Sequence, residues 1–252
     1  MESIASKKID NDITRLRLTI QINLSGFSVK ISNPLGKFLY SQKRVFPIGM
    51  LSLTDIGEFI KEEINSPIFL NKQFAAVRVY YGTEKYCIVP ADYYSPDKVY
   101  DTLNLLHPIK EDEQVLSLSL PETKAYLIYA IPSATMVDIT KIYENAEYYP
   151  IVYFLLDRIP FITENNKMIV HFARDYVHIV AAERDKLLLA NSYPTANYVT
   201  ALYYIFMAMK ELMFNPGFTK LQVSGLPEKT EESGITERKL LRKYFAGYKE
   251  IS

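Results

Sequence analysis

Alternation is strict in the stretch Arg15-Leu-Arg-Leu-Thr-Ile-Gln-Ile-Asn-Leu-Ser-Gly-Phe-Ser-Val-Lys-Ile31. Apolar residues occupy every second position on both sides of Ser25-Gly26, and this period is typical of strands that bury one face. Ser25-Gly26 itself predicts a tight turn, and Asn33-Pro-Leu-Gly36 predicts a second one. With a further strand expected at Phe38–Phe46, the sequence predicts a meander of three strands.

The same order of elements occurs twice in the chain. In the first half, the meander is followed by an amphipathic helix expected at Ser52–Ile64 and by a strand at Phe74–Tyr81. The second half repeats this order with three strands, a long helix and a strand, at Lys167–Ala173, Tyr176–Ala182, Lys186–Ser192, Ala196–Met213 and Leu221–Gly225. A repeated supersecondary unit of this kind indicates two similar subdomains.

Turn-forming residues divide the remaining sequence into shorter elements. Strands are expected at Lys85–Val89, Val115–Leu120 and Ala125–Ile131, and helices within Tyr94–Leu106, near Thr135–Tyr143 and at Ile235–Phe245. Gly247–Ile251 is expected to form a last short strand, whereas Pro150–Arg158 fits either a helix or a mixed segment. Tyr93-Tyr94 and Tyr148-Tyr149 are predicted on loops, because prolines lie close to both pairs.

The repeat also predicts how the chain is organised. Residues 1–13 are polar and are expected to form an N-terminal arm. Residues 14–162 and 163–252 are then expected to form a first and a second α/β subdomain, each within the ordinary size range of domains. We therefore expect a boundary near residue 163.

Composition excludes several classes of protein. The 252 residues contain 29 Lys+Arg and 29 Asp+Glu, and 48% of them are hydrophobic, so the bulk of the chain is expected to fold. A net charge of zero argues against a nucleic-acid-binding protein and against an electrostatic membrane anchor. No apolar stretch reaches the roughly 18 residues that a membrane helix needs. The first residues lack the apolar core of a signal peptide, so the sequence predicts a cytoplasmic protein without membrane insertion.

Side chains that hold metal ions or attack substrates are scarce. Cys87 is the single cysteine, which excludes an internal disulfide, and its apolar neighbours indicate a buried side chain. His107, His171 and His178 have no carboxylates at ligand spacing, so we predict no metal site. The spacing of His171 and His178 would place them on opposite faces of one extended strand, although a turn between them changes that. No catalytic residue is predicted.

The duplicated order of elements resembles the actin-like ATPase superfamily, which includes sugar kinases, heat-shock ATPases and actin itself. The resemblance rests on Leu16–Phe46, on Met168–Ser192, and on Leu221-Gln-Val-Ser-Gly225 with the helix after it. The chain also resembles a bacterial family of unknown function with this fold, through Ile88-Val-Pro-Ala91 and the short helix that follows. The resemblance implies an α/β fold of duplicated ribonuclease-H-like (actin-like) subdomains, each a mixed sheet with flanking helices.

In that superfamily, each meander carries a phosphate-binding turn in which an acidic residue precedes a glycine by two positions. The glycine lets backbone amides approach the phosphate, and the carboxylate holds the metal ion and its water. The resemblance places Asn23, Ser25 and Gly26 at the first turn, where no carboxylate is present. The second turn, Phe172-Ala-Arg-Asp175, has no glycine and carries its carboxylate at the opposite end.

A third element of the superfamily is a glycine-rich strand end that packs against adenosine. Ser224 and Gly225 lie at the corresponding position, and with Asn23, Ser25 and Gly26 they are the candidate residues of a nucleotide-binding cleft. Because all three elements are degraded, ATP with Mg²⁺ is disfavoured as a cofactor. We therefore predict a non-catalytic interaction or assembly module that binds a protein partner or associates with itself.

Two other functions stay open. An ATPase or small-molecule kinase would need divergent phosphate loops, and a small-ligand receptor would use a cleft between the two halves. The tyrosine pairs are consistent either with packing within strands and helices or with a recognition surface, and we expect packing for Tyr203-Tyr204. The C-terminal helix carries Arg238, Lys239, Arg242 and Lys243, which form either a solvated side or a docking patch.

Overall fold

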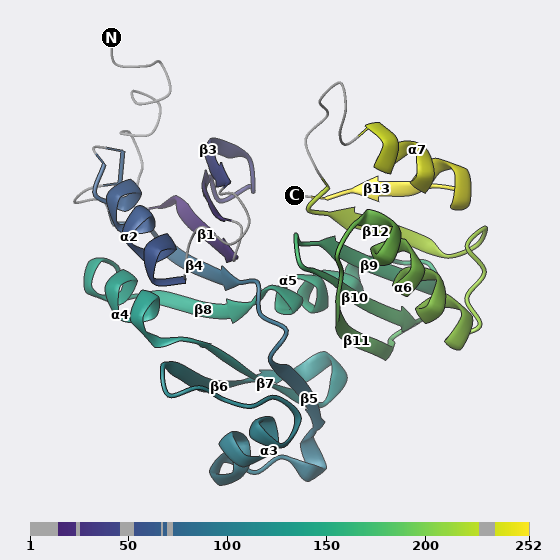
Figure 1. Cartoon of the computed structure of the whole chain (residues 1–252), viewed down its shortest axis with the longest axis horizontal. Coiled ribbons are helices and arrows are strands. Elements are labelled where there is room, and N and C mark those ends of the chain that lie inside the picture. Colours follow the sequence, from purple (N-terminus) through teal and green to yellow (C-terminus); the bar gives the residue numbers. More distant parts are fainter. Residues whose placement is uncertain are drawn as a thin grey trace. The chain divides into compact units, whose positions relative to one another are not determined.

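The chain folds into two compact units. The computed structural model describes residues 15–23, 26–45, 53–66, 68–69, 73–226 and 235–251, so the expected arm at residues 1–13 lies outside the described residues. The first unit consists of the described residues up to Cys87 with Ser95–Ser117 and Ile128–Ile151; the second consists of Ile88–Tyr94, Leu118–Leu127 and those from Val152 onward. Each unit contains a five-stranded mixed sheet (Figure 1). The boundary expected near residue 163 stays a prediction.

The five-stranded sheet of the first unit consists of a meander and two more strands, and two helices contact it. Its elements are β1 (Arg17–Asn23), β2 (Gly26–Ser32), β3 (Phe38–Val45), α2 (Leu53–Ile64), β4 (Ala76–Tyr81), α4 (Ser133–Ile142) and β8 (Ala146–Pro150). The strand order is β3-β2-β1-β4-β8. The three strands of the meander pair antiparallel, and β1 pairs parallel with β4, which pairs parallel with β8. Helices α2 and α4 contact each other.

One face of this sheet is apolar and buried, and the other is polar. Along β1, Leu18, Ile20 and Ile22 are buried, whereas Thr19 and Gln21 between them are half-buried. β2 alternates in the same way. The period of two expected from the sequence is therefore confirmed, and it identifies the face that carries the core.

The second unit repeats this topology strand for strand. Its elements are β9 (Asn166–Phe172), β10 (Tyr176–Glu183), β11 (Lys186–Pro194), α6 (Tyr198–Glu211), β12 (Lys220–Ser224), α7 (Ile235–Tyr244) and β13 (Tyr248–Glu250). The strand order is β11-β10-β9-β12-β13. The meander again pairs antiparallel, and β9, β12 and β13 are mutually parallel. The duplication predicted from the sequence is confirmed.

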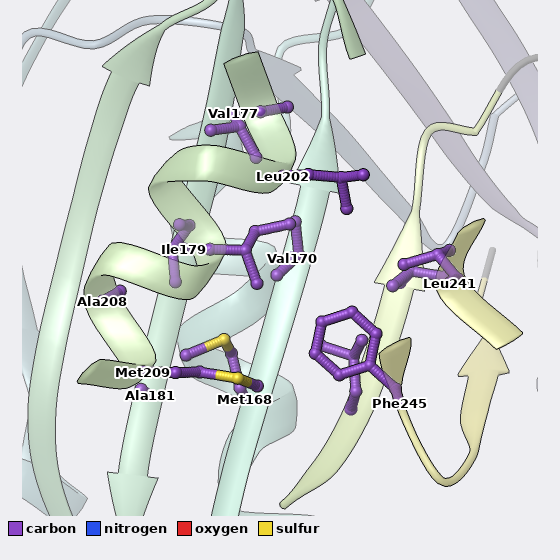
Figure 2. Close-up of a cluster of buried hydrophobic side chains, with 14 of the residues drawn as sticks. Met168, Val170, Val177, Ile179, Ala181, Leu202, Ala208, Met209, Leu241 and Phe245 are labelled. Carbon is purple, nitrogen blue, oxygen red and sulfur yellow. The ribbon is translucent and has the colours of Figure 1, made fainter. Parts of the chain in front are cut away.

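Two strands of the second sheet, β9 and β10, are buried on both faces. Side chains along β9 and β10 are buried almost without interruption, which is typical of strands covered on both sides. Figure 2 shows the core that the sheet forms with α6 and α7. This cluster includes Met168, Val170, Val177, Ile179, Leu202, Met209, Leu241 and Phe245. The helices therefore attach to the sheet through their apolar sides.

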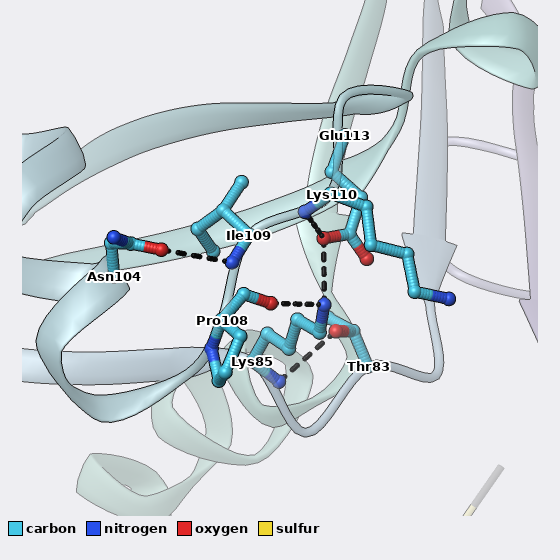
Figure 3. Close-up of polar contacts among 7 residues, drawn as sticks. All are labelled: Thr83, Lys85, Asn104, Pro108, Ile109, Lys110 and Glu113. Atoms are coloured by element: carbon cyan, nitrogen blue, oxygen red, sulfur yellow. Dashed lines mark hydrogen bonds and ion pairs between the residues drawn. The ribbon is translucent and has the colours of Figure 1, made fainter.

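A smaller, three-stranded sheet has the order β5-β7-β6. Its strands are β5 (Tyr86–Pro90), β6 (Glu113–Leu120) and β7 (Ala125–Pro132), and α3 (Val99–Leu106) precedes β6. Lys85 Nζ donates to the Pro108 carbonyl and to Glu113 Oε2, at 2.7 Å each (Figure 3). The Lys110 amide donates to the same carboxylate oxygen at 2.9 Å. This largely buried ion pair fastens the connection before β5 to the start of β6.

Two expectations about secondary structure change. Tyr148-Tyr149, predicted on a loop, lies in β8, so that prediction was wrong. Pro150 ends the strand rather than preventing it, because the parallel pairing with β4 supplies the other backbone partners. Pro150–Arg158, left open between helix and mixed segment, forms helix α5 at Ile151–Arg158. Among the described residues, every helix is too short or too polar to cross a membrane.

Candidate functional site

The first candidate turn joins β1 to β2. Asn23 is the last residue of β1 and Gly26 the first of β2, and the two are paired in the register of the hairpin. Ser25, the third candidate residue of this turn, lies outside the described residues. The structure therefore brings Asn23 and Gly26 together at one end of the first sheet.

Backbone packing requires glycine at position 26. Its φ of +141° is rarely adopted by residues with a side chain, and a Cβ atom there would lie 2.0 Å from the Arg44 carbonyl oxygen on β3. The neighbouring strand end is also tight, because the Gly82 amide donates to the Ile22 carbonyl at 2.8 Å. A Cβ atom on Gly82 would lie 2.9 Å from the Cβ of Asn23. Glycine at position 26 thus has a structural cause that involves no phosphate.

The second candidate pair lies at the end of β12. Ser224 is the last residue of this strand, and its hydroxyl forms a buried hydrogen bond of 2.9 Å with Nδ1 of His171. Gly225 follows with a φ of +74°, and a Cβ atom there would lie 2.1 Å from the Phe172 carbonyl oxygen at the end of β9. Both candidate glycines therefore approach a backbone carbonyl of a neighbouring strand in their own unit, which a side chain would prevent.

A polar row crosses the second sheet at this level. The strand register pairs Ser192 with His178, His178 with His171, and His171 with Ser224. His178 Nδ1 lies 2.6 Å from the Ser192 hydroxyl oxygen, and the two imidazole centroids are 5.9 Å apart. His178 is fully buried, and within the described part of the chain its Nε2 has no hydrogen-bond partner. Burial, reinforced by the nearby His171, lowers the pKa of His178 to about 3, so its ring is neutral.

Sequence reasoning did not find this row. The turn between β9 and β10 reverses the chain, so His171 and His178 become register partners on one face. The signal that would have found them is their equal distance from the Arg174–Asp175 peptide bond at the middle of the turn, because residues equidistant from the middle of a hairpin turn pair across it. Ser192 and Ser224 come from the two outer neighbours of this hairpin, and their pairing depends on the complete sheet.

The candidate turns carry few groups that could hold a nucleotide with Mg²⁺. The residue two positions before Gly26, where the superfamily places a carboxylate, is Leu24, and the Ser224 hydroxyl already bonds His171. At the second turn, the Ala173 amide donates to the Tyr176 carbonyl at 2.9 Å, which closes an ordinary hairpin. Considering only the residues that the structure describes, no group of three or more His, Cys, Asp or Glu side chains is placed to hold a metal ion. Mg²⁺ bound with a triphosphate is usually held by one or two carboxylates together with phosphate oxygens and water, and neither Asn23 nor Ser224 supplies a carboxylate.

The tyrosine pairs lie in different surroundings. Tyr204 of α6 stacks on Tyr193 of β11, with ring centroids 4.7 Å apart, so it packs as expected. Tyr203 meets the Tyr204 ring edge-on, with ring centroids 5.4 Å apart, and is otherwise 63% exposed. Tyr93-Tyr94 lies at the end of a single turn of 3₁₀ helix between β5 and α3, where Tyr93 is exposed. Exposed tyrosines are therefore present on both a helix and a connection.

Comparison with solved structures identifies the fold. A structure from Bacteroides thetaiotaomicron VPI-5482, described as a protein with actin-like ATPase fold and unknown function, matches with a TM-score of 0.73 at 22% identity. The match covers 95% of this chain and 92% of that chain. The PilM-PilN type IV pilus biogenesis complex matches with a TM-score of 0.53 at 12% identity, over 94% of this chain and 88% of that one. This protein therefore has the actin-like ATPase fold, with two mixed sheets consistent with duplicated ribonuclease-H-like subdomains.

The sequence also matches a family model over residues 6–246, nearly the whole chain. The family is described as "Protein of unknown function (DUF3822)", and this chain belongs to it. The expected membership in a family of unknown function with an actin-like fold is therefore confirmed. A comparison with curated proteins gives no match.

Proposed function

We propose that this chain is a non-catalytic actin-like protein that serves as an interaction or assembly module. The observation that carries the proposal is the packing of Gly26 and Gly225. At Gly26, the glycine of the first candidate phosphate turn, a Cβ atom would lie 2.0 Å from a strand carbonyl oxygen. At Gly225, on the strand end that would pack against adenosine, the corresponding distance is 2.1 Å. The fold itself accounts for both glycines, so neither is evidence for a bound nucleotide.

The chemistry of the neighbouring side chains supports the same proposal. Hydrolysis or transfer of a phosphoryl group depends on a metal ion, on carboxylates that hold it and on donors that stabilise the transferred group. Asn23 supplies no negative charge, and the Ser224 hydroxyl is already bonded to a buried histidine. An ATPase or kinase would have to assemble these groups from other positions.

The surface offers features that an interaction module uses. Large apolar side chains are exposed on the helices of both units, among them Leu105, Leu106, Val199 and Tyr203. Exposed aromatic and aliphatic groups of this size are favoured at protein interfaces. A chain with the same fold has been solved within the PilM-PilN pilus biogenesis complex, which is a precedent for this fold in a protein assembly. We expect a cytoplasmic protein partner or a second copy, rather than nucleic acid.

Light scattering and affinity capture test the proposal. The full chain, at 29.1 kDa, is expected to show a larger mass at micromolar concentration or to retain a defined partner from its native cells. A substitution in the core could abolish self-association and partner binding simply by unfolding the chain. Tyr203→Ala, at an exposed position, is therefore the appropriate probe. A strictly monomeric chain that retains no partner would contradict the proposal.

A further inference from the structure

One stripe of α6 lies at the surface of the second unit and reaches α7 through Phe206. Val199, Tyr203, Phe206 and Lys210 follow one another at intervals of four, three and four residues, so they lie on one side of the helix. The Phe206 ring centroid lies 5.4 Å from that of Tyr244, the last residue of α7. The stripe therefore lies beside α7 and is continuous with its exposed end.

Val199 and Tyr203 of this stripe are exposed although α6 is anchored in the core, whereas Phe206 is half-buried and stacks on Phe245 with ring centroids 5.4 Å apart. Val199 is 68% exposed and Tyr244 is 43% exposed, similar to Tyr203. On the opposite side of α6, Leu202 and Ile205 are buried in the core of the second unit. The outer side chains of α6 are therefore exposed on a helix that is packed against the core. We call this surface the α6–α7 patch: Val199, Tyr203, Phe206, Lys210, Lys243 and Tyr244.

The patch is surrounded by positive charge. Lys210, Lys239 and Lys243 are exposed, and Lys243 Nζ lies 5.1 Å from the centroid of the Tyr244 ring. None of the ion pairs among the described residues involves these three lysines. Two described acidic residues are close in sequence to these lysines: Glu211, next to Lys210, is exposed, and Glu237 of α7 is half-buried. In a chain whose net charge is zero, this local excess of lysine is complementary to an acidic partner.

The packing of α7 argues against a lipid surface as the partner. A helix that lies in a membrane interface inserts its apolar side between the lipids. The apolar side of α7 is already occupied, because Leu241 and Phe245 are buried in the core. What remains exposed is Val199 and Tyr203 on α6 and Tyr244 at the end of α7, with lysines beside them. Exposed apolar groups of this kind suit the apolar stripe of a docked amphipathic helix.

We propose that the α6–α7 patch binds an acidic amphipathic helix of a partner protein. This inference rests on the proposed interaction function and specifies the chemistry of its partner. Tyr203 and Tyr244 contact the apolar stripe of the bound helix, and Lys210 and Lys243 pair with carboxylates along its sides. The aromatic anchors supply most of the affinity, and the exposed lysines supply salt-dependent attraction.

Two peptides of 14 residues, the length of α6, test this assignment against the full chain. Both carry leucines along one helical stripe; the remaining positions are glutamate in one peptide and lysine in the other. Fluorescence anisotropy is expected to show that the glutamate peptide binds and that added salt weakens it. Tyr203→Ala should weaken binding about tenfold or more. The matched control Tyr100→Ala, which removes a ring that is 51% exposed on α3, should leave it unchanged.

The outcomes separate this inference from the broader proposal. Equal binding of the lysine peptide, or binding that Tyr203→Ala leaves intact, would overturn the assignment. If the chain binds vesicles of phosphatidylserine and Tyr203→Ala abolishes that binding, the assignment is also overturned, because a lipid surface would then be the partner. Circular dichroism of Tyr203→Ala verifies that the variant is folded. If the peptides fail while affinity capture still retains a partner, the patch assignment is wrong and the interaction function stands.

Discussion

Acid is expected to destabilise this protein through His178. The buried ring has a pKa of about 3 in the folded chain, whereas an unperturbed histidine titrates at about 6.5. The folded state therefore keeps the ring neutral, and the unfolded state takes up a proton as the pH falls through about 6.5. The stability linked to this ring is complete above about pH 6.5 and is lost progressively as the pH falls toward 3.

The linked free energy is large enough to measure. At pH 5 the unfolded ring is about 97% protonated while the folded ring stays neutral, so the free energy of unfolding is about 2 kcal/mol lower than at pH 8. Since the domain stability of natural proteins is about 5–15 kcal/mol, this is a substantial fraction. This contribution comes from the His178 ring, which stays neutral in the folded chain because it is fully buried, with Nδ1 lying 2.6 Å from the Ser192 hydroxyl oxygen.

Urea unfolding at pH 8 and pH 5, followed by circular dichroism, measures this difference. The variant His178→Asn keeps a polar group near the position of Nδ1, but asparagine does not titrate. From pH 8 to pH 5, the free energy of unfolding of this variant should therefore fall by about 2 kcal/mol less than that of the unmodified chain. His107→Asn, at a half-buried site outside the second sheet, is the matched control and should retain the full loss. Equal losses in the unmodified chain and in His178→Asn would refute the reasoning.

Substitutions at packed positions give two further predictions, both measured by urea unfolding at pH 8. Gly26→Ala and Gly225→Ala should each lower the free energy of unfolding by about 2 kcal/mol or more, because a Cβ atom would collide with a strand carbonyl. Gly247→Ala, where a Cβ atom meets nothing within 4 Å, should be nearly neutral; equal effects at all three positions would contradict this account. Lys85→Met should cost about 3 kcal/mol by leaving the largely buried carboxylate of Glu113 without its cation, and an unchanged midpoint would contradict it.

The fold was predictable where a local sequence pattern has one structural explanation, such as alternation in a strand that buries one face. The alternation along β1 arises because one face of the first sheet is apolar and the other polar, and period two records this directly. The duplication was predictable for the same reason, since the order of elements is visible without knowing how they pack. β8 escaped prediction because its five residues show no clean alternation and take their strand conformation from the pairing with β4.

The sequence was enough to predict that Gly26 and Gly225 lie at strand ends, but not why glycine is required there. The sequence locates Gly26 and Gly225 at strand ends, and the structure places both there. A glycine that admits a phosphate and a glycine that admits a neighbouring carbonyl look identical in a sequence, because both simply lack a side chain. Only the distance from the missing Cβ atom to Arg44 or Phe172 distinguishes them. The row through His171 and His178 likewise depends on register, which the turn and the whole sheet determine together.

Titration with ATP and Mg²⁺ tests the central claim most directly. The unfolding temperature of the full chain is measured by thermal shift as Mg-ATP increases into the millimolar range, with Mg²⁺ alone as the reference. Specific binding would stabilise the folded state by about 2.7 kcal/mol at a ligand concentration one hundred times the dissociation constant. Because backbone packing accounts for both candidate glycines and no carboxylate precedes Gly26 by two positions, no change is expected. A rise in unfolding temperature that grows with Mg-ATP concentration would contradict the account.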